Sequence, residues 1–439
     1  MGVLQPVSAC GKATLTCSVR ALARSATARR ACCLLRPQQP QRHCSTTASP
    51  SVTAERSETG AAVAAPPLMN LFDMSWEEVE ALMVQDWKQP AFRAKQLWHD
   101  IYVKGMIDFE QMSTLPVSLR QQLSQRCTLG YAHVKKELCS KLDSTRKWLL
   151  SFEDKERSKK ANVETVFIPE DTRGTLCVSS QVGCTLACTF CHTGTQPIMR
   201  NLKAGEIVTQ LMTARRQLSA FPLSAMERNV ISNIVFMGQG EPFYNYRNVQ
   251  KALKILTHPE GCQINKRRIT VSTSGVVPNI SRLGSDFPGI GLAISLHAPN
   301  DQLRNQIVPL NKQYPLAQLL NACKAFPGLS YMNRITFEYV MLNQVNDEIS
   351  HAEELVKLIK GIPCKVNLIP FNPWPGAPYK CSSPERIARF TQVLLRAGLD
   401  CPVRKSRGRD IMAACGQLNT TDKTTPATTT PTTSPAAVV

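Results

Sequence analysis

TLCVSSQVGCTLACTFC, residues 175–191, joins a short apolar run to a loop with three closely spaced cysteines. The run, 175–179, has the length and composition of a buried strand. Similar runs recur along the rest of the chain, with amphipathic segments of helical spacing between them. The runs lie at 231–236, 269–273, 292–296, 335–341 and 366–369, with one more candidate strand at Val403, and the helical segments lie near 205–217, 246–256, 315–325, 348–360 and 384–397. Strands and helices that alternate in this way predict an α/β protein with a parallel sheet, either open or rolled into a full or partial barrel.

Polar and glycine-rich motifs follow these runs. MGQGEP (237–242) comes after the second run, STSG (272–275) overlaps the end of the third, and SLHAP (295–299) closes the fourth. Parallel strands present their carboxyl ends at one edge of a sheet or one mouth of a barrel. The functional site is therefore predicted at that edge.

The cysteine loop has the spacing of a metal centre. Cys184, Cys188 and Cys191 are separated by three and then two residues, which matches neither bacterial ferredoxins nor the paired CxxC motifs of zinc ribbons. Three thiolates are too few for a closed zinc site, and His192 is too close in sequence to Cys191 to complete the same tetrahedron. An iron–sulfur cube held by three thiolates instead leaves one iron open to a small molecule. Zinc remains the alternative from spacing alone.

With Phe190 before its last cysteine, this loop resembles the signature of the radical-SAM superfamily. Within that superfamily the chain resembles the RlmN family over residues 70–418. The resemblance implies a partial (β/α)6 TIM-like barrel with a small N-terminal helical accessory domain. One departure is Gln239, where the family has Met. The matching runs are VETVFIPE (163–170), TLCVSSQVGC (175–184), MGQGEP (237–242), VSTSGVVP (271–278), SLHAP (295–299), RITFEYVML (334–342), NLIPFNP (367–373) and RGRDIMAACGQL (407–418).

The resemblance implies a methyltransferase acting on adenine C2 in large-subunit ribosomal RNA and, in bacteria, in tRNA. Its cofactors would be a 4Fe-4S cluster on the three loop cysteines and S-adenosylmethionine (SAM), two molecules per turnover. Adenine C2 lies between two ring nitrogens and is electron-poor, so a 5′-deoxyadenosyl radical replaces direct attack on SAM. In the family a protein cysteine carries the methyl group, a second cysteine resolves the adduct by forming a disulfide, and a glutamate removes the C2 proton. The matching residues are Cys415, Cys177 and Glu164, respectively.

The family's SAM contacts also have counterparts here. They match Gly240, Glu241, Ser272, Ser295, Leu296, His297 and Asn372. A target base must be splayed out of its RNA, and positive charge near the mouth would hold the backbone. The basic residues predicted there are Arg267, Arg268, Arg404, Lys405, Arg407 and Arg409.

Two other functions fit the same motifs. The sister C8-adenine methyltransferases of the Cfr type share the cluster and both mechanistic cysteines. A non-catalytic RNA-binding or ribosome-assembly factor could keep the cluster for structure alone. Retention of Cys415, Cys177 and Glu164 argues against the second alternative.

Charge and composition agree with a nucleic-acid partner. The 439 residues include 52 Lys and Arg against 33 Asp and Glu, a net charge of +19. The first 54 residues contain seven of these bases and no acid, and without them the excess is still +12. A polyanionic partner is therefore predicted. No run reaches the roughly 18 apolar residues of a membrane span, so no membrane association is expected.

The chain divides into segments of different composition. Ser75-Trp-Glu-Glu78 is a capping box that opens a predicted helical region, and the acid-free leader is typical of an organelle transit peptide. The predicted segments are a transit peptide (1–54), a linker (55–69), a helical accessory domain that helps to bind RNA (70–130), a basic connecting segment (131–162), the radical-SAM core (163–418) and a disordered Thr/Pro-rich tail (419–439).

The leader suits a chloroplast or a mitochondrion. We favour the chloroplast, because a bacterial-type ribosome and a ferredoxin occur together there. The electron donor is then expected to be a ferredoxin or flavodoxin, and the protein is expected to be a monomer.

Overall fold

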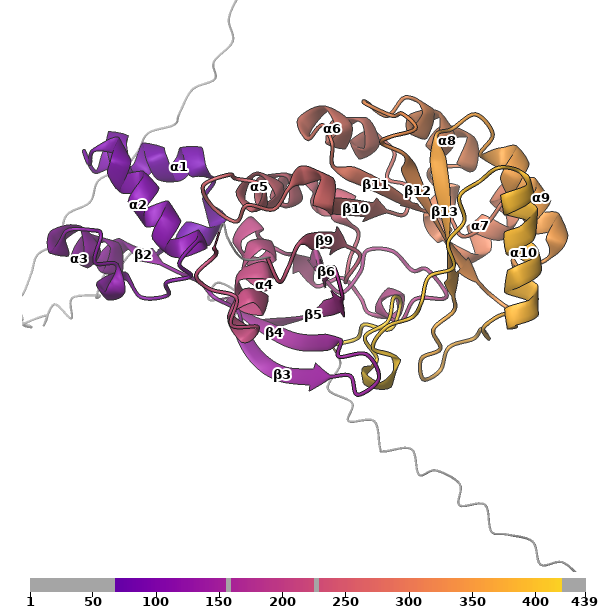
Figure 1. Ribbon diagram of the computed structural model, residues 1–439, viewed down its shortest axis with the longest axis horizontal. Coiled ribbons are helices and arrows are strands. Elements are labelled where there is room, and N and C mark those ends of the chain that lie inside the picture. The colour runs from indigo at the N-terminus through magenta and orange to yellow at the C-terminus, as the bar shows by residue number, and fades with distance from the viewer. Residues whose placement is uncertain (1–67, 155–158, 225–228, 421–439) are drawn as a thin grey trace, which may run out of the picture. The chain divides into compact units, whose positions relative to one another are not determined.

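The computed structural model describes residues 68–154, 159–224 and 229–420, and its main feature is a nine-stranded sheet of order β13-β12-β11-β10-β9-β6-β5-β4-β3 (Figure 1). Six of these strands run parallel and coincide with the six predicted apolar runs. The outermost of the six, β6 and β13, do not pair with each other within the described residues, so the parallel part is open, as in a partial barrel. The prediction of a parallel α/β sheet is confirmed. The six strands are β6 (Arg173–Cys177), β9 (Asn233–Phe236), β10 (Ile269–Thr273), β11 (Gly291–Ser295), β12 (Ile335–Met341) and β13 (Cys364–Pro370).

Helices connect successive parallel strands. Two of them, α6 and α7, were not predicted because each contains only two apolar residues, Ile and Leu, among polar ones. α6 begins with a proline, which suits a first helical position, and the Asn300 side chain caps α7 by accepting a hydrogen bond from the Leu303 amide at 3.0 Å. The helices are α4 (Ala204–Gln217), α5 (Tyr246–Leu256), α6 (Pro278–Asp286), α7 (Asp301–Ile307), α8 (Leu316–Lys324), α9 (Ile349–Leu358) and α10 (Pro384–Arg396).

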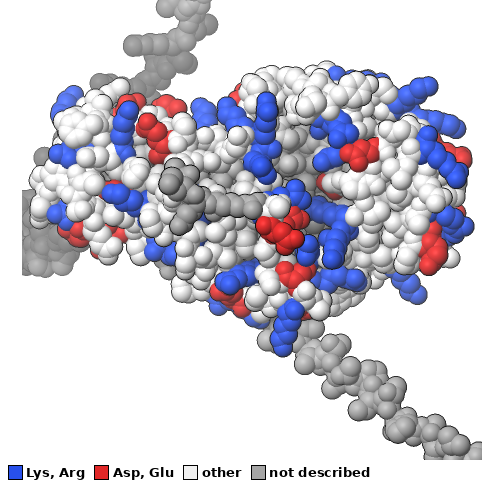
Figure 2. Space-filling view, viewed as in Figure 1, with Lys and Arg blue, Asp and Glu red and all other residues white. Residues whose placement is uncertain are grey.

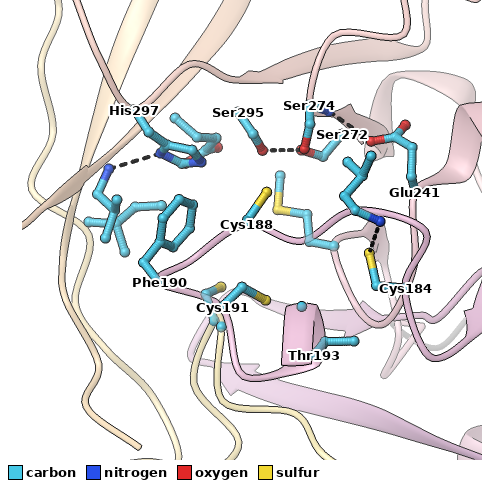
Figure 3. A pocket seen from close by; sticks show the side chains of 18 of the residues that line it. Cys184, Cys188, Phe190, Cys191, Thr193, Glu241, Ser272, Ser274, Ser295 and His297 are labelled. Atoms are coloured by element: carbon cyan, nitrogen blue, oxygen red, sulfur yellow. Dashed lines mark hydrogen bonds between the residues drawn. The ribbon is translucent and has the colours of Figure 1, made fainter. Parts of the chain in front are cut away.

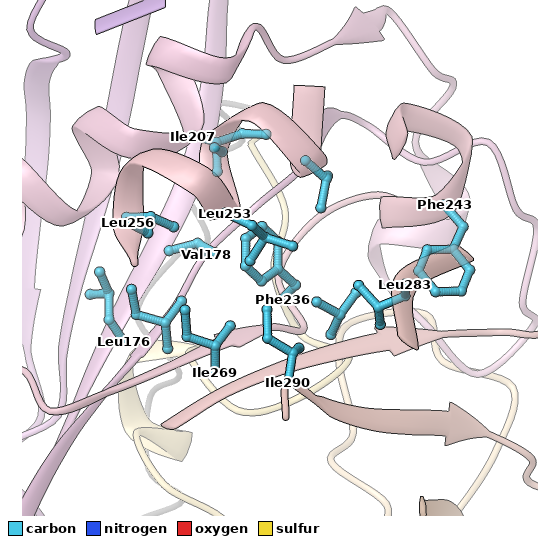
Figure 4. Close-up of a cluster of buried hydrophobic side chains, with 14 of the residues drawn as sticks. Leu176, Val178, Ile207, Phe236, Phe243, Leu253, Leu256, Ile269, Leu283 and Ile290 are labelled. Carbon is cyan, nitrogen blue, oxygen red and sulfur yellow. The ribbon is translucent and has the colours of Figure 1, made fainter. Parts of the chain in front are cut away.

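The hydrophobic core lies between the parallel strands and these helices. Figure 4 shows Leu176 and Ile269 of the sheet facing Ile207 of α4 and Leu253 of α5. All four side chains are fully buried. Burying one such side chain contributes about 1.5–3 kcal/mol, which fixes the strands and so the positions of the loops that follow them.

The segment predicted as a basic connection is part of the sheet. Strands β3 (His133–Cys139), β4 (Arg146–Asp154) and β5 (Lys159–Glu170) extend the sheet in antiparallel order beyond β6. The prediction of a connecting segment over 131–162 is wrong because its many charges hide an alternation in which Trp148 and Leu150 are buried. The exposed lysines gather on β3, an edge strand, where charge discourages pairing with other chains.

The N-terminal part contains the predicted helices. They are α1 (Trp76–Ala81), α2 (Ala91–Tyr102) and α3 (Val117–Arg126), joined by the small parallel pair β1 (Met69–Asn70) and β2 (Cys127–Thr128). The capping box forms, with the Ser75 amide donating to Glu78 Oε2 at 2.7 Å. Two polar contacts join this part to the core. Glu78 Oε1 lies 2.7 Å from Lys251 Nζ of α5, and Asp73 Oδ1 accepts from the Gly205 amide of α4 at 2.7 Å.

Some predictions fall outside the described residues: the transit peptide, the linker as far as residue 67 and the tail beyond residue 420. Val403 forms a single parallel bridge with Leu368 rather than a strand. In the part of the chain that the structure describes, no helix has both the length and the apolar character needed to cross a membrane.

Candidate active site

A pocket of about 990 Å³, counting the solvent at its mouth, lies at the carboxyl ends of the parallel strands. Figure 3 shows the cysteine loop on one side of it and Ser272 and Ser295 on the other. The predicted edge of the sheet therefore carries a pocket. Its lining includes the predicted Cys184, Cys188, Cys191, Gly240, Glu241, Ser272, Ser295, His297, Asn372 and Cys415.

The backbone around the three loop cysteines is held by hydrogen bonds. The Leu186 amide donates to Cys184 Sγ at 3.3 Å, and the Cys191 amide donates to the Cys188 carbonyl at 3.1 Å. The Trp374 indole donates to the Phe190 carbonyl at 3.1 Å, and its ring stacks on His192 with 4.6 Å between centroids. These hydrogen bonds and the stacked rings fix the shape of the loop.

The donor set of this loop fits an iron–sulfur cluster. Within the described residues, no three His, Cys, Asp or Glu side chains are close enough together to hold one metal ion. Sulfurs that share one zinc lie about 2.3 Å from it, whereas each thiolate of a cube binds its own iron. Burial raises the pKa of the Cys184 thiol to about 12 and also raises the pKa of Cys188. Bound iron would reverse this effect, because a coordinating thiol is deprotonated. Three thiolates on one loop could hold a cluster and leave one iron open to a small molecule.

Glu241 shapes the pocket from within. Its Oε2 accepts from the Ser274 amide at 2.8 Å and its Oε1 from the Phe243 amide at 3.1 Å. Burial raises the pKa of this carboxyl to about 7, although the amide donors oppose the rise. Gly240 has φ +95°, and a Cβ there would lie 2.4 Å from the Cβ of Gln181, so glycine is required where the backbone turns towards the pocket.

His297 lines the pocket as a neutral ring, but Leu296 does not line it. His297 Nδ1 accepts from the Val340 amide at 3.1 Å, which places the ring proton on Nε2. Burial lowers the pKa of His297 to about 3, and nearby Arg304 adds to the effect. The side chain of Leu296 is fully buried, its amide donates to the Glu338 carbonyl and its carbonyl accepts from Arg304 Nε. The side chain of Leu296 is therefore not at the pocket, because it points away from the side that its two neighbours, Ser295 and His297, face.

A second pocket of about 540 Å³ contains the two predicted mechanistic cysteines. Cys177 is the last residue of β6, and Cys415 lies in the C-terminal segment 408–420. Both thiols are free. Burial raises the pKa of Cys177 to about 12, and the neighbouring Cys415 adds to this rise while Arg404 opposes it. Cys415 also lines the larger pocket, so it lies where the two cavities meet.

The segment 408–420 that carries Cys415 is tied down on several sides. Asn372 Nδ2 donates to the Cys415 carbonyl at 3.2 Å, and the His192 amide donates to the Gly416 carbonyl at 2.8 Å. From the β3–β4 turn, Ser140 Oγ donates to Asp410 Oδ1 at 2.7 Å. These contacts join the cysteine loop and the antiparallel strands to Cys415.

The structure does not bring Glu164 to either pocket. It lies on β5, is buried, and its Oε1 is 2.8 Å from Lys147 Nζ. Its Oε2 accepts from the Asn419 amide at 2.8 Å. Burial raises the pKa of Glu164 and Lys147 opposes the rise. In this arrangement Glu164 anchors the end of the segment that carries Cys415.

Gln239, the departure from the family motif, supports Glu164. Its Oε1 accepts from the Glu164 amide at 2.9 Å, and its Nε2 donates to Gln196 at 3.0 Å. The side chain is fully buried. A methionine could not donate to Gln196 and could accept from the Glu164 amide only weakly, so Gln239 ties β5 to the MGQGEP loop through a polar contact.

Only some of the six basic residues predicted near the mouth lie at the pockets. Arg404, Lys405 and Arg407 line the second pocket. Arg267 and Arg268 precede β10 and so lie at its amino end, away from the pockets, which contradicts their predicted place at the mouth. The face in Figure 2 shows Lys and Arg side chains around a hollow.

Three charged residues at or beside the site were missed or treated as general charge. Glu338 is the only charged residue of β12, Lys147 lies in the charged strand β4, and Arg404 lines both pockets. A lone charge inside an apolar strand could have identified Glu338, because buried charges are rare unless paired or bound to something.

Comparisons with known proteins cover both parts of the chain. Residues 69–129 match the family model described as the ribosomal RNA large subunit methyltransferase N-terminal domain, and residues 178–359 match the radical SAM superfamily. A relative from Rhodospirillum rubrum, named dual-specificity RNA methyltransferase RlmN, is 53% identical over 80% of this chain and 81% of its own length. A second of the same name, from a Chelativorans species, is 54% identical over 75% of this chain and 83% of its own.

One solved structure is similar over most of the chain. It is a radical SAM methyltransferase from Sphaerobacter thermophilus, which is 43% identical, with a TM-score of 0.72 and coverage of 80% of this chain and 99% of that one.

Proposed function

Because the chain belongs to the RlmN family of radical-SAM proteins, we propose that it is an RNA methyltransferase that acts on C2 of an adenosine in large-subunit ribosomal RNA. Relatives named dual-specificity extend the proposal to tRNA. The single observation that carries it is the place of Cys415 between two pockets, one lined by the cluster cysteines and the other by Cys177. A methyl carrier must face both the source of the radical and the target base.

Membership of the superfamily implies a 4Fe-4S cluster and SAM. When bound by the three loop cysteines, the cluster supplies the electron that splits SAM to a 5′-deoxyadenosyl radical. The larger pocket would hold the cosubstrate between the cysteine loop and the ends of β9, β10 and β11. We propose two SAM molecules per turnover, one for the methyl group on Cys415 and one for the radical.

In the proposed reaction the target base lies in the second pocket, between the two thiols. The apolar walls of that pocket suit a base, and Lys405 and Arg407 at its rim suit the phosphates beside it. The carbon radical carried by Cys415 would add to C2, and the adduct would then lose the C2 proton to a base and its unpaired electron to a one-electron acceptor such as the oxidised cluster. The Cys177 thiolate then attacks Cys415 Sγ. A disulfide bond forms, the S–C bond breaks, and the carbon keeps that electron pair and takes a proton to become the methyl group. An external reductant then restores the two thiols.

Glu164 is proposed to take the C2 proton. Its carboxyl must then turn from Lys147 and the Asn419 amide towards the second pocket. Such a turn would loosen the segment that carries Cys415, which links proton removal to movement of the carrier.

The test is an anaerobic assay of the reconstituted protein with reductant, SAM and a ribosomal RNA fragment, followed by mass spectrometry of the digested nucleosides. We expect 2-methyladenosine. 8-Methyladenosine would assign the sister activity, and a reducible cluster without methyl transfer would assign a binding factor.

We also propose that the protein works in the chloroplast as a monomer, with a ferredoxin-type donor. The acid-free leader of 54 residues supports an organelle. The compartment is tested by imaging a fluorescent protein fused to residues 1–60. We expect it in chloroplasts, and fluorescence in mitochondria would contradict the proposal.

A further inference from the structure

The loop that follows β13 holds one half-buried tryptophan among exposed residues. Over 373–376 every residue except Trp374 is exposed. Trp374 lines neither of the two pockets, so it is not part of either binding surface. Any role of Trp374 in the site must therefore act through other residues.

Trp374 contacts the cysteine loop on both sides of Cys191. Its indole N–H donates to the Phe190 carbonyl at 3.1 Å. Its ring lies parallel to the His192 imidazole, with 4.6 Å between the ring centroids and 4° between the ring planes. One side chain thus holds the residues that flank the last cysteine of the loop.

His192 connects this contact to the segment 408–420. Its Nδ1 lies 3.3 Å from the Gln417 carbonyl oxygen, and its Nε2 lies 2.6 Å from Asn419 Nδ2. An amide nitrogen only donates, so Nε2 is the acceptor, and the ring proton on Nδ1 is donated to the Gln417 carbonyl. The ring orientation that Trp374 stacks against is therefore the one that bonds to the segment.

The same segment also bonds to the two residues before Trp374. Gln417 Nε2 donates to the Pro373 carbonyl at 2.7 Å. Asn372 Nδ2 donates to the Cys415 carbonyl at 3.2 Å. The cysteine loop, the loop after β13 and the segment that carries Cys415 thus meet around the indole.

These contacts are needed to hold Cys415 in place. Residues 412–420, all of which the structure describes, form no helix or strand, and Cys415 itself is half-buried. A stretch without backbone ladders keeps its position only through local contacts of this kind. A reacting group that moves by about 1 Å can lose most of its reactivity, so the place of this thiol matters.

We propose that Trp374 is a positioning residue that clamps the segment carrying Cys415 to the cysteine loop. The stacked indole fixes His192, and His192 holds the backbone next to Cys415. The thiol is thereby kept where the two pockets meet. The role of Cys415 as methyl carrier rests on the proposed function, whereas the clamp itself does not.

Alkylation of individual thiols tests the clamp without turnover. The anaerobically reconstituted protein is pulsed with iodoacetamide, and peptide mass spectrometry gives the reaction rate at each cysteine. For Trp374→Ala we expect Cys415 to react roughly tenfold faster or more, because a ring stack and a hydrogen bond are lost and the segment opens more often. Trp374→Phe keeps an aromatic ring and loses the N–H, so an increase of roughly two- to fivefold is expected.

Two further substitutions and one internal control sharpen the test. Gln417→Met removes the side-chain bond to the neighbouring loop while Trp374 stays in place, and it should speed alkylation of Cys415 by roughly two- to tenfold. Buried Cys262 should keep its wild-type rate in every variant. Trp87→Ala, at a half-buried tryptophan that lines neither pocket, is the matched control and should leave the Cys415 rate unchanged. Where Trp374→Ala fails to fold, Trp374→Phe and Gln417→Met carry the test.

Turnover supplies a second measurement, which a purely structural role would not change. With SAM, reductant and substrate RNA, the amount of 5′-deoxyadenosine formed per methyl group transferred reports how well the carrier is placed. A misplaced Cys415 leaves the 5′-deoxyadenosyl radical to take hydrogen elsewhere. For Trp374→Ala we expect this ratio to rise roughly threefold or more, and Trp374→Phe should restore most of the coupling.

Several results would overturn the inference. One is a wild-type rate at Cys415 in all three site variants. Another is faster alkylation of Cys262 together with Cys415, which would show a general loss of packing. An unchanged ratio of 5′-deoxyadenosine to methyl groups in Trp374→Ala would also overturn it. Wild-type protein that forms neither product would overturn the proposed function, and the alkylation rates would still decide whether the clamp exists.

Discussion

Replacement of Lys147 by Met breaks the buried ion pair under the segment that carries Cys415. Lys147 Nζ lies 2.8 Å from Glu164 Oε1, and both side chains are 7% exposed. The same ammonium donates to the Met412 carbonyl at 2.9 Å. Methionine fills a similar volume but carries no charge. The Glu164 carboxylate then loses its ammonium partner and keeps the hydrogen bond from the Asn419 amide.

The expected loss of stability at pH 7.5 is large. Removing one partner of a buried pair costs about 3–5 kcal/mol, because the other charge is left without compensation. Burial already raises the pKa of Glu164, and losing Lys147, which opposes that rise, raises it further. As the pH falls, Glu164 in the folded variant takes up a proton at a pH where the same carboxyl in the unfolded chain is still ionised. This proton uptake favours the folded state, so the variant's free energy of unfolding should approach that of the wild type as the pH falls from 7.5 towards about 5.

Urea unfolding under anaerobic conditions measures this, with tryptophan fluorescence as the probe, since buried Trp148 is next to Lys147. In the Lys147→Met, Glu164→Gln double variant both charges are gone, and most of the loss should be restored. Lys251→Met is the control, because its ion pair with Glu78 is partly exposed and is worth about 0–1 kcal/mol. A cost for Lys147→Met no greater than the control, or a deficit that grows at low pH, would refute the reasoning.

Three other substitutions test the pocket and the core. Cys188→Ser should abolish iron and sulfide uptake on reconstitution, and chemical analysis showing wild-type content would contradict its assignment as a ligand. Gly240→Ala places a Cβ 2.4 Å from the Gln181 Cβ at φ +95°, so SAM affinity should fall by at least about tenfold, and unchanged binding in dialysis would count against this turn. Phe236→Ala, at 1% exposure, should cost about 3–5 kcal/mol in urea unfolding, and a loss under about 1 kcal/mol would show that the site is not tightly packed.

The parallel sheet was predictable because its strands are short runs rich in buried apolar residues, with β12 buried along its whole length. Runs such as Ile269–Thr273 and Ile335–Met341 are short, apolar and followed by polar loops, which sets both the strand and the edge where ligands bind. The antiparallel strands were not predicted, since the lysines and arginines of β3 and β4 mask an alternation that burial reveals.

Site residues that belong to one short motif could be predicted from the sequence. Site residues that are far apart in sequence and meet only in the folded protein could not. The cysteine loop and the Gly240–Glu241 turn are local motifs, and both line the predicted pocket. Glu338 and Arg404 meet across strands and loops far apart in sequence, so no spacing could reveal them. Leu296 and Glu164 were assigned by motif, and the structure turns both away from the pockets.

The most direct test of the proposed division of labour between the two thiols uses Cys177→Ala with SAM, reductant and substrate RNA. Without the resolving thiol, the protein should stay covalently bound to RNA, and peptide mass spectrometry should place the nucleotide on Cys415. Cys262→Ala, a buried cysteine outside both pockets, should release methylated RNA like the wild type. Free methylated RNA from Cys177→Ala, or an adduct on any other cysteine, would contradict the account.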